Sequence, residues 1–295
     1  MEFLFSVFTP TYNRANTIGR TYEYLCKQTL RSFEWIIVDD GSTDNTEEIV
    51  QKWINTNKIS IVYLKQENGG KHRAFNRAVQ IAKGEIFICL DSDDYYIETA
   101  LEIIYSYHLI HKDNPWIAGF SCNSLDLYGN LIGTSLPVDE LVVSHYNLYN
   151  SLSVKGDKGL IYYTRILKEY PFPEFENEFF VTEALVLNRI SLRYKICCIK
   201  RSLEIKDYQR DGLSSKYRHL CLRNPNGYAL YINERNYFNL SFTNYVINAA
   251  SYVRYSLFAG KSFRNIYKEA INRRWTFIIA CFLGILLYIK DKSRS

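Results

Sequence analysis

Short apolar runs alternate with amphipathic segments over roughly the first ninety residues. Runs rich in β-branched and aromatic residues, bounded by turn-forming residues, are typical of buried parallel strands. They occupy residues 3–9, 33–38, 59–64 and 85–90. The segments between them repeat apolar residues at helical spacing, at 17–28, 44–55 and 71–82. This alternation predicts an α/β fold with a mainly parallel sheet and right-handed crossovers.

The pattern becomes less regular after residue 94. The expected elements are a helix at 97–111, a strand at 116–121, a hairpin turn at Asp126–Asn130, irregular structure at 134–180, a helix at 183–190 and a strand at 194–205. From residue 215 the pattern is helical to the end. We therefore expect an α/β domain in residues 1–213 and a helical extension in residues 214–295.

Polar side chains follow three of the predicted strands. These clusters are Thr9–Arg14, Asp39–Ser42 and Asp91–Asp94. In a parallel sheet the carboxyl ends of the strands share one edge, and ligands bind in the crevice there. We therefore expect the three clusters to converge, although they lie tens of residues apart.

The carboxylates of Asp91–Asp94 allow two interpretations. Mg²⁺ and Mn²⁺ prefer oxygen ligands and commonly share them with substrate phosphates, so Asp91 and Asp93 are candidate metal ligands. Asp also favours surface turns and helix caps, and Asp94 is expected near the start of the next helix. The expected convergence with two other polar clusters favours the metal–phosphate interpretation.

Composition and charge narrow the classes of partner. The formal net charge of +5 fits a small anionic substrate or an anionic membrane surface, and no nucleic-acid-binding module is recognisable. The seven cysteines contain no CxxC pair, so zinc-site spacing is missing. No basic leader precedes the first predicted strand, and we therefore expect a reducing, cytoplasmic setting with free thiols.

Four motifs, taken in order and with their spacing, resemble those of family 2 glycosyltransferases with the GT-A fold. They are TPTYNR at 9–14, VDDGSTD at 38–44, NGGK at 68–71 and DSD at 91–93. The resemblance is specific over about the first 100 residues and weaker to about residue 214. It implies an inverting, metal-dependent enzyme of bacterial cell-surface polysaccharide synthesis. Residues 1–100 would bind the nucleotide-sugar donor, most often a UDP-sugar, and residues 101–213 the acceptor.

The resemblance also implies roles for individual residues. Thr11 and Tyr12 lie where the family holds uracil and ribose, and Asp40 lies where a carboxylate reads the uracil edge, with Asp39 beside it. Asp93 would contact Mn²⁺ or Mg²⁺. Asp91 would face the ribose or the metal. The remaining candidates for the donor site are Thr9, Pro10, Gly70 and Ser92.

Two basic residues remain open between a functional and a structural interpretation. Lys71 and Arg14 lie near the expected phosphate position and would add positive charge there. A solvated surface role is the alternative for each of them.

An inverting enzyme needs a general base to deprotonate the acceptor hydroxyl. In the family this group often lies in an acidic pair at a helix start, and the corresponding stretch here, Phe180–Ala184, contains only Glu183. Glu183 is therefore our candidate base. A first-turn Glu that only favours the helix dipole is the alternative. Asp211, in a predicted turn, is the second candidate.

The most apolar stretch lies near the end of the chain, at residues 275–289, with basic residues on both sides. As a helix it would be about 22 Å long, whereas a bilayer core is about 30 Å thick. These features predict an interfacial helix on an anionic inner leaflet, which would suit an acceptor carried on a polyprenyl lipid. A helix packed on the protein, or a dimer contact, is the alternative.

Two other functions fit the sequence less well than glycosyl transfer does. A nucleotidyltransferase on a similar sheet would be expected to have a Gly-rich phosphate loop after the first strand, and Thr9–Arg14 contains no glycine. A non-catalytic sugar- or nucleotide-binding scaffold would be expected to lack the metal carboxylates or the base, but Asp91, Asp93 and Glu183 are present.

Overall fold

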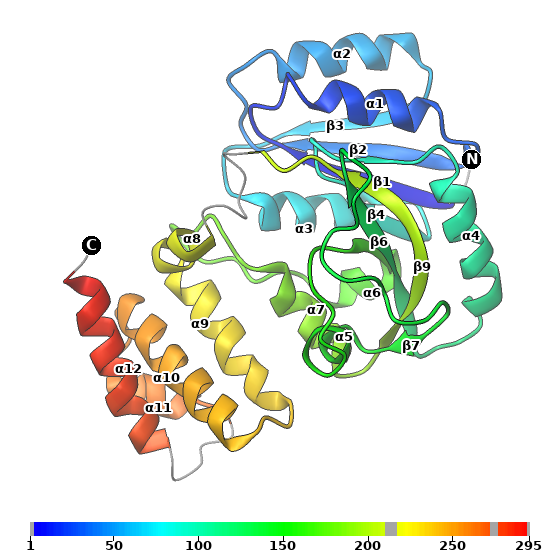
Figure 1. The fold of residues 1–295 in the computed structure, drawn as a ribbon. Helices are drawn as coiled ribbons and strands as arrows, with labels where there is room; N and C mark the ends of the chain where they lie inside the picture. The colour runs from blue at the N-terminus through cyan, green and yellow to red at the C-terminus, as the bar shows by residue number, and fades with distance from the viewer. Residues whose placement is uncertain (1–2, 210–216, 272–276, 294–295) are drawn as a thin grey trace. The chain divides into compact units, whose positions relative to one another are not determined.

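The computed structural model describes residues 3–209, 217–271 and 277–293. The chain divides into two compact units (Figure 1). The sheet unit comprises Met1–Pro171 and Leu187–Arg210, and the helical unit comprises Phe172–Val186 and Asp211–Ser295. The predicted boundary between residues 213 and 214 lies outside the described residues.

The first half of the sheet unit alternates strands and helices as the sequence predicts. Its elements are β1 (Phe5–Thr11), α1 (Ile18–Cys26), β2 (Phe33–Asp39), α2 (Thr46–Thr56), β3 (Ser60–Lys65), α3 (Lys71–Ile81), β4 (Ile86–Cys89), β5 (Tyr95–Tyr96) and α4 (Ala100–His111). Strands β2 and β4 are buried along their whole length, because helices cover both faces of this part of the sheet (Figure 1).

The second half contains more regular structure than the sequence predicts. Its elements are β6 (Ile117–Asp126), β7 (Val142–Val143), α5 (His145–Asn150), β8 (Gly159–Tyr163), α6 (Thr164–Glu169) and β9 (Lys195–Lys206), with α7 (Glu183–Ser191) before β9. The prediction of irregular structure throughout 134–180 was therefore wrong. Helices and strands of two to six residues are too short to show a period, and tertiary pairing stabilises them.

The strands form one mixed sheet in the order β3-β2-β1-β4-β8-β6-β9-β5, with β7 paired to β9. Strands β1 to β4 run parallel, with Phe5 opposite both Phe33 and Ile86. Strand β8 runs antiparallel between β4 and β6. The mixed, mainly parallel α/β sheet confirms the predicted fold class.

Two glycines allow neighbouring backbones of this sheet to approach closely. A Cβ atom on Gly84 would lie 2.3 Å from the carbonyl carbon of Phe5, and one on Gly119 would lie 2.1 Å from the carbonyl oxygen of Ile161. Both distances are far inside van der Waals contact. These positions therefore require glycine to keep β4 beside β1 and β6 beside β8.

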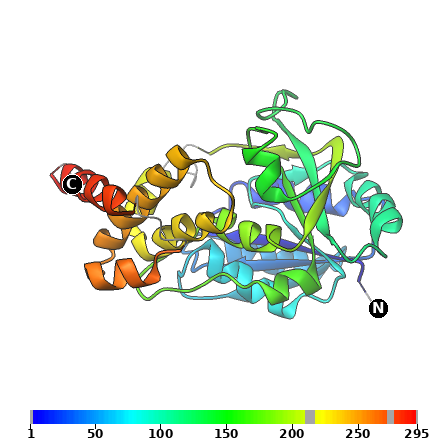
Figure 2. The same cartoon turned by 90° about the horizontal axis from the view of Figure 1, so that it is seen from below.

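The helical unit contains the predicted C-terminal helices. They are α8 (Tyr217–Arg223), α9 (Pro225–Glu234), the 3₁₀ helix η2 (Arg235–Tyr237), α10 (Phe242–Phe258), α11 (Phe263–Glu269) and α12 (Phe277–Lys292). Helix α12 lies beside α10 (Figures 1 and 2). The contact is close, because a Cβ atom on Gly284 would lie 2.6 Å from the carbonyl oxygen of Ala250. None of the helices in the described residues combines the length and apolarity needed to cross a membrane.

Candidate functional site

The polar loops after β1, β2 and β4 start at the same edge of the sheet. Thr11 lies opposite Asp39, and the next amide, that of Asp40, donates to the carbonyl of Thr11 at 2.8 Å. On the other side of β1, the amide of Leu90 donates to the carbonyl of Phe8, also at 2.8 Å. The three clusters therefore converge, as their positions after parallel strands predict.

The carboxylate of Asp40 holds the turn that precedes α3. Its Oδ1 accepts hydrogen bonds from the Gly69 amide and from Nε2 of Gln66, both at 2.8 Å, and its Oδ2 accepts one from the Gly70 amide at 2.8 Å. Gly70 has φ +92°, which favours glycine. Asp40 therefore fixes the backbone from which Lys71 projects, a role that its sequence position alone does not reveal.

Two predicted donor-site residues lie inside the sheet unit. Asp39 has no exposed surface, and its two carboxylate oxygens accept from the Ser42 amide at 2.7 Å and from the Tyr63 hydroxyl at 2.6 Å. Burial and the charge of Asp39 raise the pKa of Tyr63. Thr9 is equally buried, and its Oγ1 accepts from the Trp35 indole at 2.8 Å. Both side chains support the loops from within.

Asn13, which sequence reasoning did not single out, ties the first two loops together. Its φ is +52°, in the left-handed region that Asn tolerates better than most residues. Its amide donates to Oγ of Ser42 at 2.9 Å, and its Oδ1 accepts from the Thr43 amide at 2.8 Å. One indication of this role is present in the sequence: Asn13 is a polar residue in the loop that follows the first predicted strand. Beside it, Tyr12 is 48% exposed and free to pack against a ligand.

The predicted residues around Tyr12 differ in exposure. Thr11 is buried, and its Oγ1 has no hydrogen-bond partner among the described residues. Pro10 and Arg14 are half-buried. Burial opposes ionisation of Asp91, and the charge of Arg14, after that of Lys71 and Lys206, contributes to lowering the pKa of Asp91.

The acidic loop, residues 91–94, carries the candidate metal ligands. Oδ1 of Asp91 forms an ion pair with Nζ of Lys71 at 2.6 Å. Burial opposes ionisation of Asp91, but the charges of Lys71, Lys206 and Arg14 outweigh it and hold its pKa below the usual value. Burial, followed by the neighbouring charge of Asp91, raises the pKa of Asp93. Two adjacent carboxylates and a lysine therefore meet at the sheet edge.

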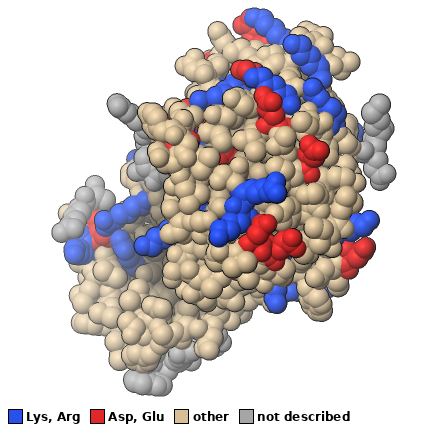
Figure 3. All heavy atoms as spheres, turned by 45° about the vertical axis from the view of Figure 1, so that its right-hand side comes forward, with Lys and Arg blue, Asp and Glu red and all other residues tan. Residues whose placement is uncertain are grey.

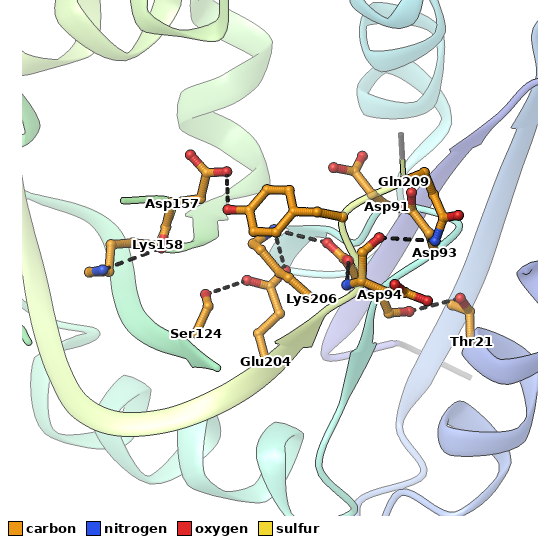
Figure 4. A network of polar contacts seen from close by, with 12 residues as sticks. Thr21, Asp91, Asp93, Asp94, Ser124, Asp157, Lys158, Glu204, Lys206 and Gln209 are labelled. Carbon is orange, nitrogen blue, oxygen red and sulfur yellow. Dashed lines mark hydrogen bonds and ion pairs between the residues drawn. The ribbon is translucent and has the colours of Figure 1, made fainter. Parts of the chain in front are cut away.

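The fourth residue of the acidic loop belongs to a buried ionic network (Figure 4). Nζ of Lys206 lies 2.9 Å from Oδ2 of Asp94 and 3.2 Å from Oε1 of Glu204, and the Ser124 hydroxyl donates to Oε2 of Glu204 at 2.7 Å. The prediction that Asp94 lies at a helix start was therefore wrong, since α4 begins at Ala100. Burial, then the charges of nearby acidic groups, raise the pKa of Asp94 to about 7, although Lys206 opposes this.

Helix α1 supports the acidic loop from the other side. The guanidinium of Arg20 donates to the carbonyl of Asp93 at 3.1 Å and pairs with the carboxylate of Asp207. The Thr21 hydroxyl donates to the carbonyl of Asp94 at 2.8 Å. Ser92 is buried within the loop. The loop is therefore held from two directions through backbone and side-chain contacts.

The donor atoms present fit a shared metal ion better than a resident one. Within the described residues, no group of three or more His, Cys, Asp or Glu side chains could hold a metal ion. Asp91 and Asp93 supply two carboxylates. Mg²⁺ is typically bound by one or two carboxylates together with substrate phosphates and water. The pair therefore fits an ion that binds with a diphosphate.

The candidate base Glu183 belongs to the helical unit. Glu183 is the first residue of α7, half-buried, where a carboxylate interacts favourably with the helix dipole. Asp211 lies outside the described residues.

Residues 6–122 match the family described as Glycosyl transferase family 2. The chain is 35% identical over 149 residues to glycosyltransferase GlyG of Streptococcus pneumoniae, and the aligned region covers 48% of each chain. It is 38% identical over 100 residues to the poly(ribitol-phosphate) beta-N-acetylglucosaminyltransferase TarS of Staphylococcus aureus, covering 33% of this chain and 18% of that one. The matches thus span about half the length of GlyG and less of TarS.

Two solved structures resemble the whole chain in fold. Residues 1–349 of S. aureus TarS, in complex with UDP-GlcNAc, align with a TM-score of 0.63 and 20% identity over 98% of this chain and 91% of that one. The mannosyltransferase PcManGT from Pyrobaculum calidifontis, in complex with GDP-Man and Mn²⁺, aligns with a TM-score of 0.55 and 16% identity over 98% and 88%. Residues 6–122 are therefore similar to glycosyl transferase family 2, and the sheet unit has the GT-A fold.

Proposed function

We propose that this protein is an inverting glycosyltransferase of cell-surface polysaccharide synthesis. It would transfer a sugar from a nucleotide-sugar to a hydroxyl of a glycan or of a polyprenyl-diphosphate-linked acceptor. The observation that carries the proposal is the convergence at one sheet edge of exposed Tyr12, the Asp40-held glycine turn and the ion pair of Lys71 with Asp91. Such an edge offers a ring platform and mixed charge to a nucleoside diphosphate.

Charge development on the leaving group explains why these residue types are needed. The nucleoside diphosphate gains negative charge as the glycosidic bond breaks, and preorganised positive groups stabilise that charge. Lys71 and Arg14 would supply it from the protein. Asp91 and Asp93 would hold a divalent cation, Mg²⁺ or Mn²⁺, together with the diphosphate, and the cation would supply further positive charge there.

Acceptor activation would come from Glu183, with Asp211 as the second candidate. Inversion by direct displacement requires a base that removes the proton of the attacking hydroxyl. The assignment of Glu183 rests on the sequence resemblance of Phe180–Ala184 to the family's acidic helix start.

The proposed donor is a UDP-sugar. The TarS structures with UDP-GlcNAc and UDP support this choice, although PcManGT was solved with GDP-Man. The donor half would be residues 1–100, the acceptor half 101–213 and the extension 214–295. We place the enzyme in the cytoplasm, with a peripheral contact at the inner face of the cell membrane.

A donor screen tests the proposal. The full chain is mixed with UDP-, GDP- and dTDP-sugars and Mn²⁺ or Mg²⁺, with and without a lipid-linked acceptor, and release of nucleoside diphosphate is measured. We expect turnover with one UDP-sugar. Asp93→Asn should abolish metal-dependent nucleotide binding, whereas Glu48→Gln, on the exposed face of α2, should not.

Three results of these experiments, together with an assay on a nucleoside triphosphate and a sugar phosphate, would argue against the proposal. Nucleotide-sugar binding without turnover under all conditions would indicate a non-catalytic scaffold. Release of pyrophosphate from a nucleoside triphosphate and a sugar phosphate would indicate a nucleotidyltransferase. Equal metal-dependent binding by Asp93→Asn would remove the assigned metal ligand.

A further inference from the structure

Helix α12 carries an apolar stripe along its outer side. Seven large apolar residues of this helix are between 36% and 76% exposed. They are Ile278, Ile279, Phe282, Leu283, Leu286, Leu287 and Ile289. Their spacing of three to four residues places them on neighbouring turns of one side. The stripe therefore runs along the helix over most of its length.

The opposite side of α12 is fixed to the helical unit. Ala280 and Gly284 are buried, and Gly284 lies in close contact with α10. At the C-terminal end, Asp291 pairs with Arg254 and lies 3.5 Å from Arg218. The outward direction of the stripe is thus set by packing within the unit.

Within α12, charged side chains occur only after the stripe, at residues 290–292; in the sequence, Arg273 and Arg274 precede the helix. No charged residue occurs between Phe277 and Ile289. Lys290 and Lys292 are exposed directly after it, and the side chain of Arg218 is 75% exposed beside Asp291. Figure 3 shows a broad uncharged surface on the C-terminal helices, with lysine and arginine side chains gathered at one end. The only acidic group at this end among the described contacts, Asp291, is neutralised by its two arginine partners.

Tyrosines lie at both ends of α12. The ring of Tyr267, which is 56% exposed, lies 6.1 Å from that of Phe277 at the start of the helix. Near the other end, Nζ of Lys292 lies 5.6 Å from the centre of the Tyr288 ring. Tyrosine side chains are enriched at the level of lipid headgroups, because the ring is apolar and the hydroxyl polar.

We propose that α12 lies flat on an anionic phospholipid surface. The apolar stripe would enter the boundary between headgroups and acyl chains, and Lys290, Lys292 and Arg218 would contact anionic headgroups. The charge pattern favours lipid over a second copy of the chain, because lipid headgroups supply the negative charge that this end of the unit does not. The inference specifies the membrane contact that the proposed function includes, and its test does not depend on catalytic activity. Such a contact would bring the enzyme to a lipid-linked acceptor.

Vesicle binding by the full chain tests this surface. Vesicles that mix phosphatidylglycerol with phosphatidylcholine are compared with pure phosphatidylcholine in a flotation assay. We expect binding to the anionic vesicles that weakens with salt. Replacing Phe282 and Leu286 together by Ser should weaken binding about tenfold or more, because both large apolar groups then stay in water. Reversing Lys290 and Lys292 to Glu should weaken it about tenfold or more.

A matched control uses exposed apolar residues of the sheet unit. Ile110 and Trp116 are 63% and 62% exposed. Replacing both by Ser should leave vesicle binding unchanged. Equal binding by the Phe282→Ser, Leu286→Ser protein would overturn the proposal, as would wild-type protein that does not float with anionic vesicles. The stripe would instead be assigned to a second copy of the chain if the wild type did not bind vesicles but self-associated in sedimentation, and if the Phe282→Ser, Leu286→Ser protein did not self-associate. Circular dichroism confirms folding of each variant.

Discussion

The ammonium group of Lys206 lies 2.9 Å from the carboxylate of Asp94, although 112 residues separate them in the chain. The same ammonium contacts Glu204, and the next backbone amide, that of Asp207, donates to Asp94 at 3.0 Å. The end of β9 therefore holds the acidic loop from behind. Asp91 and Asp93 lie in the same loop, directly before the residue that this contact holds.

Lys206→Met should destabilise the protein. Two buried carboxylates would lose their shared cation, which typically lowers the free energy of unfolding by about 3–5 kcal/mol. Urea unfolding measures the loss. Lys52→Met, which breaks only the exposed pair with Glu48, should change it by less than about 1 kcal/mol. Lys206→Arg should restore part of the stability, and an unchanged unfolding curve for Lys206→Met would show that the network contributes nothing.

Asp40→Asn should loosen the turn before α3. Three N–H groups point at the Asp40 carboxylate, and an Asn side chain replaces one accepting oxygen with a donor. The free energy of unfolding should fall by about 1–3 kcal/mol. Nucleotide affinity should fall with it, measured by calorimetry, because Lys71 follows this turn directly. Glu67→Gln, at an exposed position in the same loop, is the control. If Asp40→Asn kept the stability and the nucleotide affinity of the wild type, Asp40 would not hold the turn.

Glu183→Gln should separate binding from chemistry. If Glu183 is the base, the variant should bind nucleotide-sugar as the wild type does but lose about 10²–10⁴-fold in kcat. Donor affinity and acceptor-dependent turnover are measured on the same preparation. A variant that keeps its turnover would move the assignment to Asp211, which is then tested as Asp211→Asn.

Glu178→Gln should destabilise the helical unit. Oε1 of Glu178 accepts from the amide and side chain of Asn226 at 2.7 and 3.0 Å, and Oε2 accepts from the Gly227 amide at 2.9 Å. The carboxylate thus caps the start of α9, where negative charge is favoured. We expect the free energy of unfolding, measured by thermal denaturation, to fall by about 1–3 kcal/mol. Glu176→Gln, at an exposed position nearby, should leave the melting temperature unchanged. Equal melting temperatures for the two variants would show that Glu178 does not stabilise the start of α9.

The alternation of strands and helices in residues 3–90 could be predicted from the sequence. The helices α1, α2 and α3 have nine to eleven residues, and the apolar runs of β2 and β4 are buried along their whole length, so the pattern is visible locally. The position of β8 could not be predicted. It depends on antiparallel pairing with β4 and β6, and its neighbour Gly119 becomes necessary only once that pairing exists.

The sequence by itself determined which residue types follow the strands, and therefore that carboxylates, a tyrosine and a lysine share one sheet edge. Only the tertiary structure decided how they divide the work. Adjacent side chains at a strand end point in different directions, so Asp39 bonds Tyr63 inside while Asp40 holds the glycine turn. Asp94 is drawn inward by Lys206, and Asp91 pairs with Lys71 at the edge. These partners lie far apart in the sequence, so local sequence patterns cannot predict which side chains pair.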